Sequence, residues 1–215
     1  MLDAAALLLE AQVRFRVVGV ERARIGARLA LVYLLNREPQ KAIDVLHDTQ
    51  AVEGGRDLNA QRRRLEARAL TDLGKVDEAM LLLGTDTTPE TRQLRAEVYW
   101  RAQDWANAAR ALSDMVPDAD AGTLKDADAR LVLDWATALT LAGDERTLVR
   151  VRQRYTGPMS NTPYKDAFAL ITTPRERGAM DAQAVRQQIQ QAEHFKTFMV
   201  EYKDMIGQNP LSKIN

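Results

Sequence analysis

The chain of 215 residues contains no cysteine and only two histidines, few of its residues are aromatic, and its charges cancel. The absence of cysteine excludes disulfide bonds and thiolate metal sites, and it leaves both cytoplasm and periplasm open as compartments. Thirty basic residues balance thirty acidic residues, which argues against a general polyanion binder. Composition therefore narrows the classes of function without selecting one.

Long apolar runs are also absent. The longest, residues 4–9 and 29–35, are far shorter than the roughly 20 residues that a membrane-spanning helix requires. The N-terminus carries no basic segment followed by a cleavage site, so no signal peptide is visible. We therefore expect a soluble chain without direct membrane insertion, and the sequence does not decide its compartment.

Helix-forming residues dominate what is present, and the sequence predicts an all-α protein. Start and stop signals support this. Pro39 and Pro89 suit a first helical turn, the Thr88 hydroxyl suits a cap before Pro89, Asp104 suits an N-cap, and Gly74 and Gly143 suit helix ends. Thr123 and Asp126 have capping-box spacing, and residues 173–176 form another start signal. The predicted helices cover residues 3–18, 21–36, 58–73, 76–83, 89–101, 105–116, 145–155, 163–171 and 181–206. A further helix is predicted from Pro39 toward a loop at residues 53–57, and another starts inside the loop at residues 117–128 and reaches Ala142.

Small and large residues recur at fixed places in successive predicted hairpins. The second helices carry Ala42, Ala79, Ala108 and Leu148, and twelve residues earlier each first helix has an alanine. Three residues after that alanine stands a large apolar residue. The alanines of the first helices are Ala30, Ala67, Ala96 and Ala136. The large apolar residues are Tyr33, Leu70, Tyr99 and Leu139. Small residues let two helices approach closely, and the large residue fills the space between neighbouring hairpins.

The pattern resembles the tetratricopeptide repeat (TPR) family. Residues 96–108, AEVYWRAQDWANA, are similar to the family core of small-x-x-Tyr-Tyr-x-x-Gly-Asp-Tyr-x-x-Ala, and residues 67–79 match nearly as well. The resemblance covers about residues 24–152. It implies a right-handed α-solenoid of about four degenerate hairpins over residues 1–156, followed by a helical extension over residues 157–215. An irregular helical bundle is the alternative fold.

The resemblance also implies a binding surface, because the first helices of TPR hairpins line a concave face. The family's groove positions fall on residues that we expect to contact a partner: Arg64, Arg68, Gln93, Glu97, Trp100, Arg101 and Thr137. In the first hairpin they fall on Ala27, Leu31, Leu34 and Leu35, a set too apolar for open solvent, so we expect another segment to cover it.

No motif indicates catalysis or a cofactor. His47 and His194 are far apart, without metal-ligand spacing, and fit surface or boundary positions. The acidic loop at residues 118–122 lacks the glycine and glutamate spacing of a calcium loop. We find no GxGxxG, Walker A or GxSxG sequence. We therefore expect a protein that is not an enzyme, and we assign no catalytic residue, metal or cofactor.

The densest basic cluster is Gln61-Arg62-Arg63-Arg64 with Arg68. Three interpretations fit it: a solvated helix face, a contact with a peptide or partner protein, or a nucleic-acid site. Nucleic-acid binding would require further basic stripes or stacking aromatic residues, which the sequence does not supply. We expect no nucleic-acid partner.

The three tryptophans fit different roles. Trp105 and Trp135 fall at positions that the repeat buries, so both fit a hydrophobic core. Trp100 falls at a groove position, where two interpretations are equally open: an anchor for a partner, or packing against the next hairpin.

Both ends of the chain present apolar stripes. Along the first helix Leu7, Leu8, Ala11 and Phe15 share a face, which fits the second helix of a preceding hairpin and suggests the C-terminal part of a longer solenoid. The helix predicted at 181–206 fits a cap on the solenoid, a segment lying in the groove, or a pairing surface for another copy.

The sequence therefore predicts a scaffold that binds another protein or a peptide through a concave face, of unknown partner identity. The alternative is a structural or self-associating module within a larger assembly.

Overall fold

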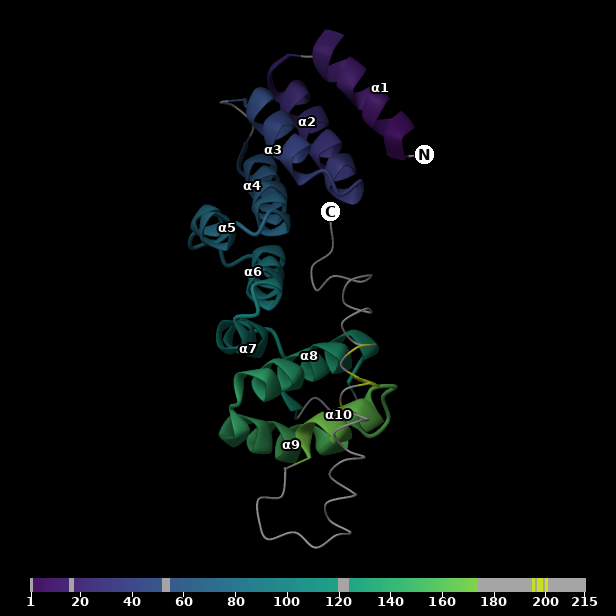
Figure 1. The fold of residues 1–215 in the computed structure, drawn as a ribbon, viewed down its shortest axis with the longest axis vertical. Coiled ribbons are helices and arrows are strands. Elements are labelled where there is room, and N and C mark those ends of the chain that lie inside the picture. The colour runs from purple at the N-terminus through teal and green to yellow at the C-terminus, as the bar shows by residue number, and fades with distance from the viewer. Residues whose placement is uncertain are drawn as a thin grey trace, which may run out of the picture. The chain divides into compact units, whose positions relative to one another are not determined.

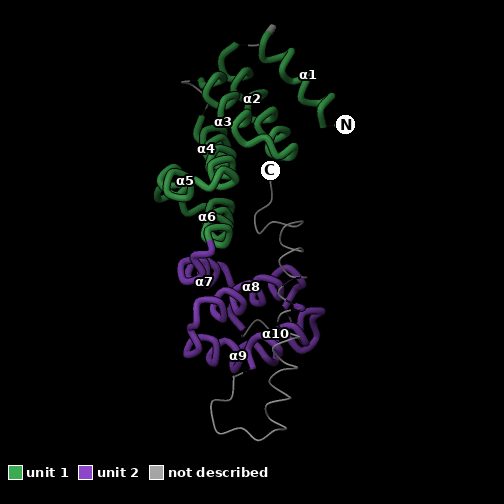
Figure 2. The backbone as a smooth tube through the Cα atoms, in the orientation of Figure 1, with its two compact units in different colours: residues 1–102, 212–215 green, residues 103–211 purple. Residues whose placement is uncertain are grey.

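The computed structural model describes residues 2–15, 18–51, 55–119 and 124–173, together with residues 195, 197, 198 and 200. Ten α-helices and no strand lie within these segments (Figure 1). The all-α prediction is therefore confirmed for the part of the chain that is described. The chain has two compact units, and the first ends at Ala102 where the second begins at Gln103 (Figure 2). The division expected between residues 156 and 157 stays a prediction.

The first unit holds six helices that pack in consecutive pairs. They are α1 (Leu2–Phe15), α2 (Gly19–Leu35), α3 (Pro39–Asp48), α4 (Gly55–Asp72), α5 (Val76–Leu83) and α6 (Pro89–Arg101). Helix α2 packs on α1 and α3, and α4 packs on α5 (Figure 1). Helix α4 also contacts α2, α3 and α6. One hydrophobic core made of side chains from α1 to α6 runs through this unit.

The predicted helix signals lie where the helices of this unit begin and end. Pro39 and Pro89 occupy the first turns of α3 and α6, where a missing N–H costs nothing. Gly74 has a φ of 76°, a left-handed conformation that glycine adopts without strain. The next amide, that of Lys75, donates to the carbonyl of Leu70 at 2.9 Å and closes the end of α4. The predicted hydroxyl cap of Thr88 is wrong, because this hydroxyl donates to the Thr91 hydroxyl at 2.9 Å.

Helix α1 packs on the core with the face opposite to the one that the sequence analysis singled out. Ala6 is buried and Leu9 and Val13 pack against the core, whereas Leu7 and Leu8 are 66% and 62% exposed. The side chain of Phe15 lies outside the described part. Because α1 carries two apolar stripes, hydrophobic periodicity alone did not decide which of them faces inward.

The apolar groove positions of the first hairpin are largely covered. Ala27 and Leu34 are buried and Leu31 packs partly into the core, while Leu35 remains 47% exposed. The inward face of α1 belongs to the same cluster of side chains. Most of this set is therefore covered, and which segment covers it stays a prediction.

The second unit is organised around α8. It holds α7 (Trp105–Ser113), α8 (Asp126–Ala142), α9 (Glu145–Met159) and α10 (Lys165–Thr172). Helix α8 contacts α7, α9 and α10, and α10 also packs on α9. The Asp104 carboxylate accepts from the Asn107 amide at 3.2 Å, which confirms the predicted cap of α7. Gly143 ends α8 with a φ of 72°, also as predicted.

Helix α9 is longer than its sequence suggested, since it continues past Tyr155 to Met159 with Pro158 in its last turn. Tyr155 and Met159 are four residues apart and both are buried. Burial of one helical stripe therefore extends the helix beyond the point where Gly157 and Pro158 predicted its end.

The recurring small residues of both units are completely buried. Each of the following has an exposed fraction of 0%: Ala30, Ala42, Ala67, Ala79, Ala96, Ala108 and Ala136. The large apolar residues Tyr33, Leu70 and Leu139 are buried as well, and Tyr99 is half-buried. The small–large pattern therefore identified core positions correctly.

Several predicted features lie outside the described residues. These are the capping hydroxyl of Thr123, the start signal at residues 174–176, His194, and nearly all of the helix predicted over residues 181–206.

Candidate functional site

The predicted groove residues fall on three helices. Arg64 and Arg68 lie on α4, and Gln93, Glu97, Trp100 and Arg101 lie on α6. These six residues belong to the first unit, whereas Thr137 lies on α8 of the second unit. The candidate site described below is therefore the α4–α6 surface of the first unit.

Arg68 and Glu97 form a buried ion pair between α4 and α6. The Arg68 Nη2 donates to Glu97 Oε2 at 2.6 Å, and the two side chains are only 6% and 3% exposed. A charge-assisted hydrogen bond of this length between buried groups is strong. Its geometry fixes the position of α6 along α4, and the burial keeps both side chains from contacting a ligand directly.

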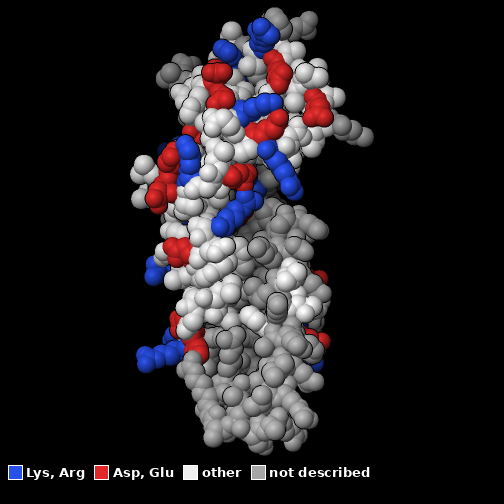
Figure 3. Space-filling view, in the orientation of Figure 1, with Lys and Arg blue, Asp and Glu red and all other residues white. Residues whose placement is uncertain are grey.

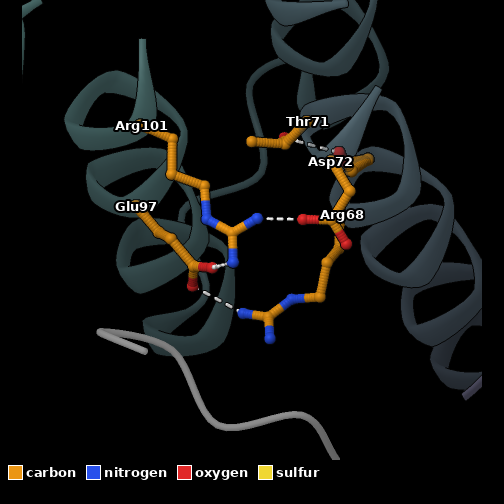
Figure 4. A network of polar contacts seen from close by, with 6 residues as sticks. Arg68, Thr71, Asp72, Glu97 and Arg101 are labelled. Atoms are coloured by element: carbon orange, nitrogen blue, oxygen red, sulfur yellow. Dashed lines mark hydrogen bonds and ion pairs between the residues drawn. The ribbon is translucent and has the colours of Figure 1, made fainter. Parts of the chain in front are cut away.

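Arg101 joins this pair to a second carboxylate. Its Nη2 lies 3.2 Å from Glu97 Oε1, and its Nη1 pairs with Asp72 Oδ1 (Figure 4). The Arg101 side chain is 42% exposed, so it is the outermost arginine of the network. Asp72 is not among the residues predicted from the repeat, although it lies four residues after Arg68 and therefore on the same stripe of α4.

The network contains two cations and two carboxylates. Burial lowers the pKa of Arg101 from its ordinary value, and repulsion by the neighbouring Arg68 lowers it further. An arginine remains charged despite such a shift. Glu97 lies between the two guanidinium groups and compensates this repulsion, so Arg68, Glu97 and Arg101 are held as a unit (Figure 4).

Three further residues lie one helical turn from the ion pair, since Arg64 is four residues before Arg68, Gln93 four before Glu97 and Trp100 three after Glu97. Gln93 is exposed, and Arg64 and Trp100 are half-buried. The pKa of Asp86 is lowered chiefly by a hydrogen bond from the Thr88 backbone amide, with a smaller contribution from the charge of Arg64. The accessible part of the site consists of Arg64, Gln93, Trp100 and Arg101.

Arg62 has a structural role that the sequence analysis did not assign to it. Its guanidinium is buried and donates to the Ala23 carbonyl at 2.6 Å, to the Leu46 carbonyl, and to Thr49 Oγ1 at 3.3 Å. These three acceptors lie on α2, near the end of α3, and directly after α3. We call this arrangement the Arg62 clip.

The basic cluster is therefore not a continuous basic face. Arg62 is directed into the protein, Arg68 is paired with Glu97, and only Arg63 of the four arginines is fully exposed. Acidic and basic side chains are interspersed over the first unit in the view of Figure 3. This charge pattern fits solvated helices and local ion pairs.

Thr137 is buried in the second unit, and its hydroxyl donates to the Leu133 carbonyl at 2.8 Å. It therefore cannot contact a ligand at the surface. Its neighbour in α8, Asp134, is 2% exposed. Burial raises the pKa of Asp134 to about 7, and Arg130, 4.0 Å away, offsets part of that rise.

The tryptophans predicted to be buried are partly buried. Trp135 packs edge-to-face on Tyr155 of α9, with ring centroids 6.2 Å apart. Trp105 at the start of α7 is half-buried. The contact between Trp135 and Tyr155 joins α8 to α9 and supports a core role for Trp135.

The described residues offer no group of three or more His, Asp or Glu side chains that could hold a metal ion. His47 is exposed and its Nε2 lies 2.7 Å from Glu66, in agreement with the predicted surface position. None of the helices in the described segments is long and apolar enough to cross a membrane.

Comparison of the chain with protein-family models, with curated proteins and with solved structures gave no match.

Proposed function

We propose that this chain is a non-enzymatic protein-interaction scaffold, a right-handed TPR-like solenoid of degenerate hairpins that binds a peptide or a partner helix. The observation that carries the proposal is the packing of α4 on α6, with Arg68 and Glu97 paired between them. In the proposed stack, α4 and α6 are the first helices of consecutive hairpins, and such helices line one face. The fully buried alanines support the same arrangement.

In this proposal the groove residues divide into two roles. Arg101, Arg64, Gln93 and Trp100 contact the ligand, because each has an accessible side chain. Arg68 and Glu97 are positioning residues that hold Arg101 through their ion pairs.

The ligand is a segment that carries a carboxylate next to an apolar side chain. A ligand carboxylate accepts from Arg101 in place of Asp72, whose side chain is 24% exposed at the edge of the network. Arginine favours such planar, two-point recognition of a carboxylate. Trp100 supplies the apolar contact, since partly exposed tryptophans are frequent anchors of protein interfaces.

The test is photo-cross-linking of the intact protein with a light-activated residue placed at Gln93. A matched protein carries that residue at Gln153, an exposed position on α9. We expect one partner to cross-link from position 93 and not from position 153. Arg101→Glu and Trp100→Ala should each reduce capture of that partner about tenfold or more, while Arg63→Glu should not. Unchanged capture by folded Arg101→Glu and Trp100→Ala proteins would refute the proposed site.

One observation favours a second candidate function, a self-associating structural module. The outward face of α1 exposes two leucines that a monomer would leave in water.

A further inference from the structure

Helix α1 is apolar on two sides. Its inward face packs against α2 (Figure 1), and its outward face exposes Leu7 and Leu8 by 66% and 62%. Ala4 and Ala11 are exposed on the same side. A helix with apolar residues around most of its circumference is usually covered on both sides.

The apolar residues on the outward face have the same spacing whether they are counted from the N-terminal or the C-terminal end of α1. Ala4, Leu7, Leu8 and Ala11 are separated by three, one and three residues. If two copies of α1 pair antiparallel about a two-fold axis between Leu7 and Leu8, then Ala4 of each meets Ala11 of the other and the leucines meet at the centre. A two-fold interface requires this kind of self-complementary surface, and the small alanines let the helices approach closely.

The charges at the two ends of α1 favour the same orientation. Asp3 lies in its first turn, where one carboxylate oxygen accepts from Asn36 Nδ2 of the same chain at 3.2 Å, and Arg14 lies in its last turn. Antiparallel pairing brings the acidic end of one helix beside the basic end of the other, and it also opposes the two helix dipoles. Parallel pairing would bring like charges and like dipole ends together.

From this self-complementarity we propose that α1 is a self-association surface on which α1 of a second copy of this chain docks antiparallel. The helix of 14 residues spans roughly 20 Å. One face of a helix of this length buries less than the roughly 1,000 Å² that a stable interface needs. The dimer is therefore weak and reversible. This inference does not depend on the α4–α6 ligand site.

Disulfide trapping tests the register, because the natural chain has no cysteine. Two single-cysteine proteins, Ala4→Cys and Ala11→Cys, are oxidised separately and then as a mixture. In the proposed register, position 4 of one copy lies beside position 11 of the other, while two copies of position 4 are displaced by about 10 Å along the helices, too far for a disulfide. We expect covalent dimers from the mixture, and few from either protein alone. Equal cross-linking by Ala4→Cys alone would refute the antiparallel register.

Sedimentation velocity of the full chain over a range of concentrations tests the association itself. The wild-type protein should form dimers as its concentration rises, and the double variant Leu7→Glu/Leu8→Glu should remain monomeric at every concentration. Leu81→Glu is the matched control, because Leu81 of α5 is 84% exposed outside the stripe, and it should dimerise like the wild type. All three leucine-to-glutamate changes in these variants are at exposed positions, so thermal unfolding of each variant should match the wild type at low concentration. A wild type that stays monomeric throughout, or a Leu81→Glu protein that loses dimers as fully as the double variant, would refute the proposal.

Discussion

Gly26 lies where α2 meets the end of α3, and it leaves room for one side chain. A Cβ atom added at Gly26 would lie 1.9 Å from Thr49 Oγ1, far inside van der Waals contact. Thr49 is itself held in place, since its hydroxyl donates to the Val45 carbonyl at 2.6 Å and accepts from Arg62. The neighbour cannot move away cheaply, so position 26 requires glycine for its small size.

Gly26→Ala should therefore destabilise the protein by about 1–3 kcal/mol, the range typical of overpacked cores, despite the better helix propensity of alanine. Urea unfolding measures this change. Gly157→Ala is the matched control, because Gly157 also lies in a helix and a Cβ there meets nothing within 4 Å beyond its two chain neighbours. That variant should stay closer to the wild type, because its gain in helix propensity is offset by contact of the new Cβ with the ring of Pro158. Equal stability of the two variants would show that the Thr49 side chain can move aside to make room for the added methyl group.

Asp134 should make the stability of the protein depend on pH. Burial raises its pKa in the folded state to about 7 from an ordinary value of 3.8. Between these two pH values the folded state binds more protons than the unfolded state, so the free energy of unfolding falls as pH rises, by at most about 1.4 kcal/mol per pH unit. The loss is complete above the folded-state pKa.

The variant Asp134→Asn isolates this effect, since the other titrating groups are common to both proteins. The difference in unfolding free energy, variant minus wild type, should rise from about pH 4 to about pH 7 and then level off. Urea unfolding at several pH values measures it. A difference that stays constant over this range would contradict a shifted Asp134 in the folded state.

At the scale of the helices, the Arg62 clip joins α4 to α2 and to the end of α3. Replacing Arg62 by methionine keeps much of the side-chain volume but removes three hydrogen bonds, and it leaves the Leu46 carbonyl near the end of α3 without its donor. An unsatisfied buried acceptor alone costs about 1–3 kcal/mol. We expect Arg62→Met to destabilise the protein by about 3 kcal/mol in chemical unfolding. The neighbouring change Arg63→Met affects an exposed side chain and should stay within about 0.5 kcal/mol of the wild type.

The ion pair between Arg68 and Glu97 should act as a coupled unit. Removing one partner leaves the other charge buried, which typically costs about 3–5 kcal/mol. We expect Arg68→Met and Glu97→Met each to be strongly destabilising, and the double variant to cost clearly less than their sum. A double-mutant cycle in urea measures the coupling. The exposed pair of Lys75 and Glu78, at 3.5 Å, should give less than about 1 kcal/mol in the same cycle.

The sequence predicted helix ends well where a local signal controls them. Proline at a first turn, glycine in the left-handed conformation and the Asp104 cap act through their own backbone, so Pro39, Gly74, Gly143 and Asp104 all behave as predicted. The end of α9 depends instead on burial of Met159. Such tertiary burial is invisible in a local pattern and overrides the breaking effect of Pro158.

At the scale of the whole molecule, self-association through α1 should make thermal stability depend on protein concentration. A ligand or second copy that binds only the folded state raises the melting temperature by mass action. Calorimetry should show a melting temperature that rises with concentration for the wild type. The Leu7→Glu/Leu8→Glu protein should melt at one temperature throughout. A wild-type melting temperature independent of concentration would contradict dimerisation in the folded state.

The candidate site could be predicted only in outline. The repeat spacing placed Arg68, Glu97 and Arg101 on one face, and the three side chains contact one another in the structure. Whether they contact a partner stays a prediction. Their burial could not be predicted, since a buried arginine and an exposed one look alike in sequence. The roles of Asp72 and Arg62 could not be predicted for a similar reason. Their partners lie on other helices, and the spacing of residues along one helix does not say which side chains of another helix come within hydrogen-bond distance.

The Arg62 clip has a consequence for hydrogen exchange. The last turn of a helix normally opens first, because its carbonyl groups lack partners within the helix. At the end of α3, however, the Leu46 carbonyl accepts from Arg62, and the Thr49 hydroxyl accepts from the same guanidinium. This turn can open only when the hydrogen bonds from Arg62 of α4 to Leu46 and Thr49 break. The Thr49 amide, which donates to the Val45 carbonyl at 3.1 Å, should therefore exchange with deuterium as slowly as amides in the middle of α4, and it should become fast in Arg62→Met while α4 stays protected.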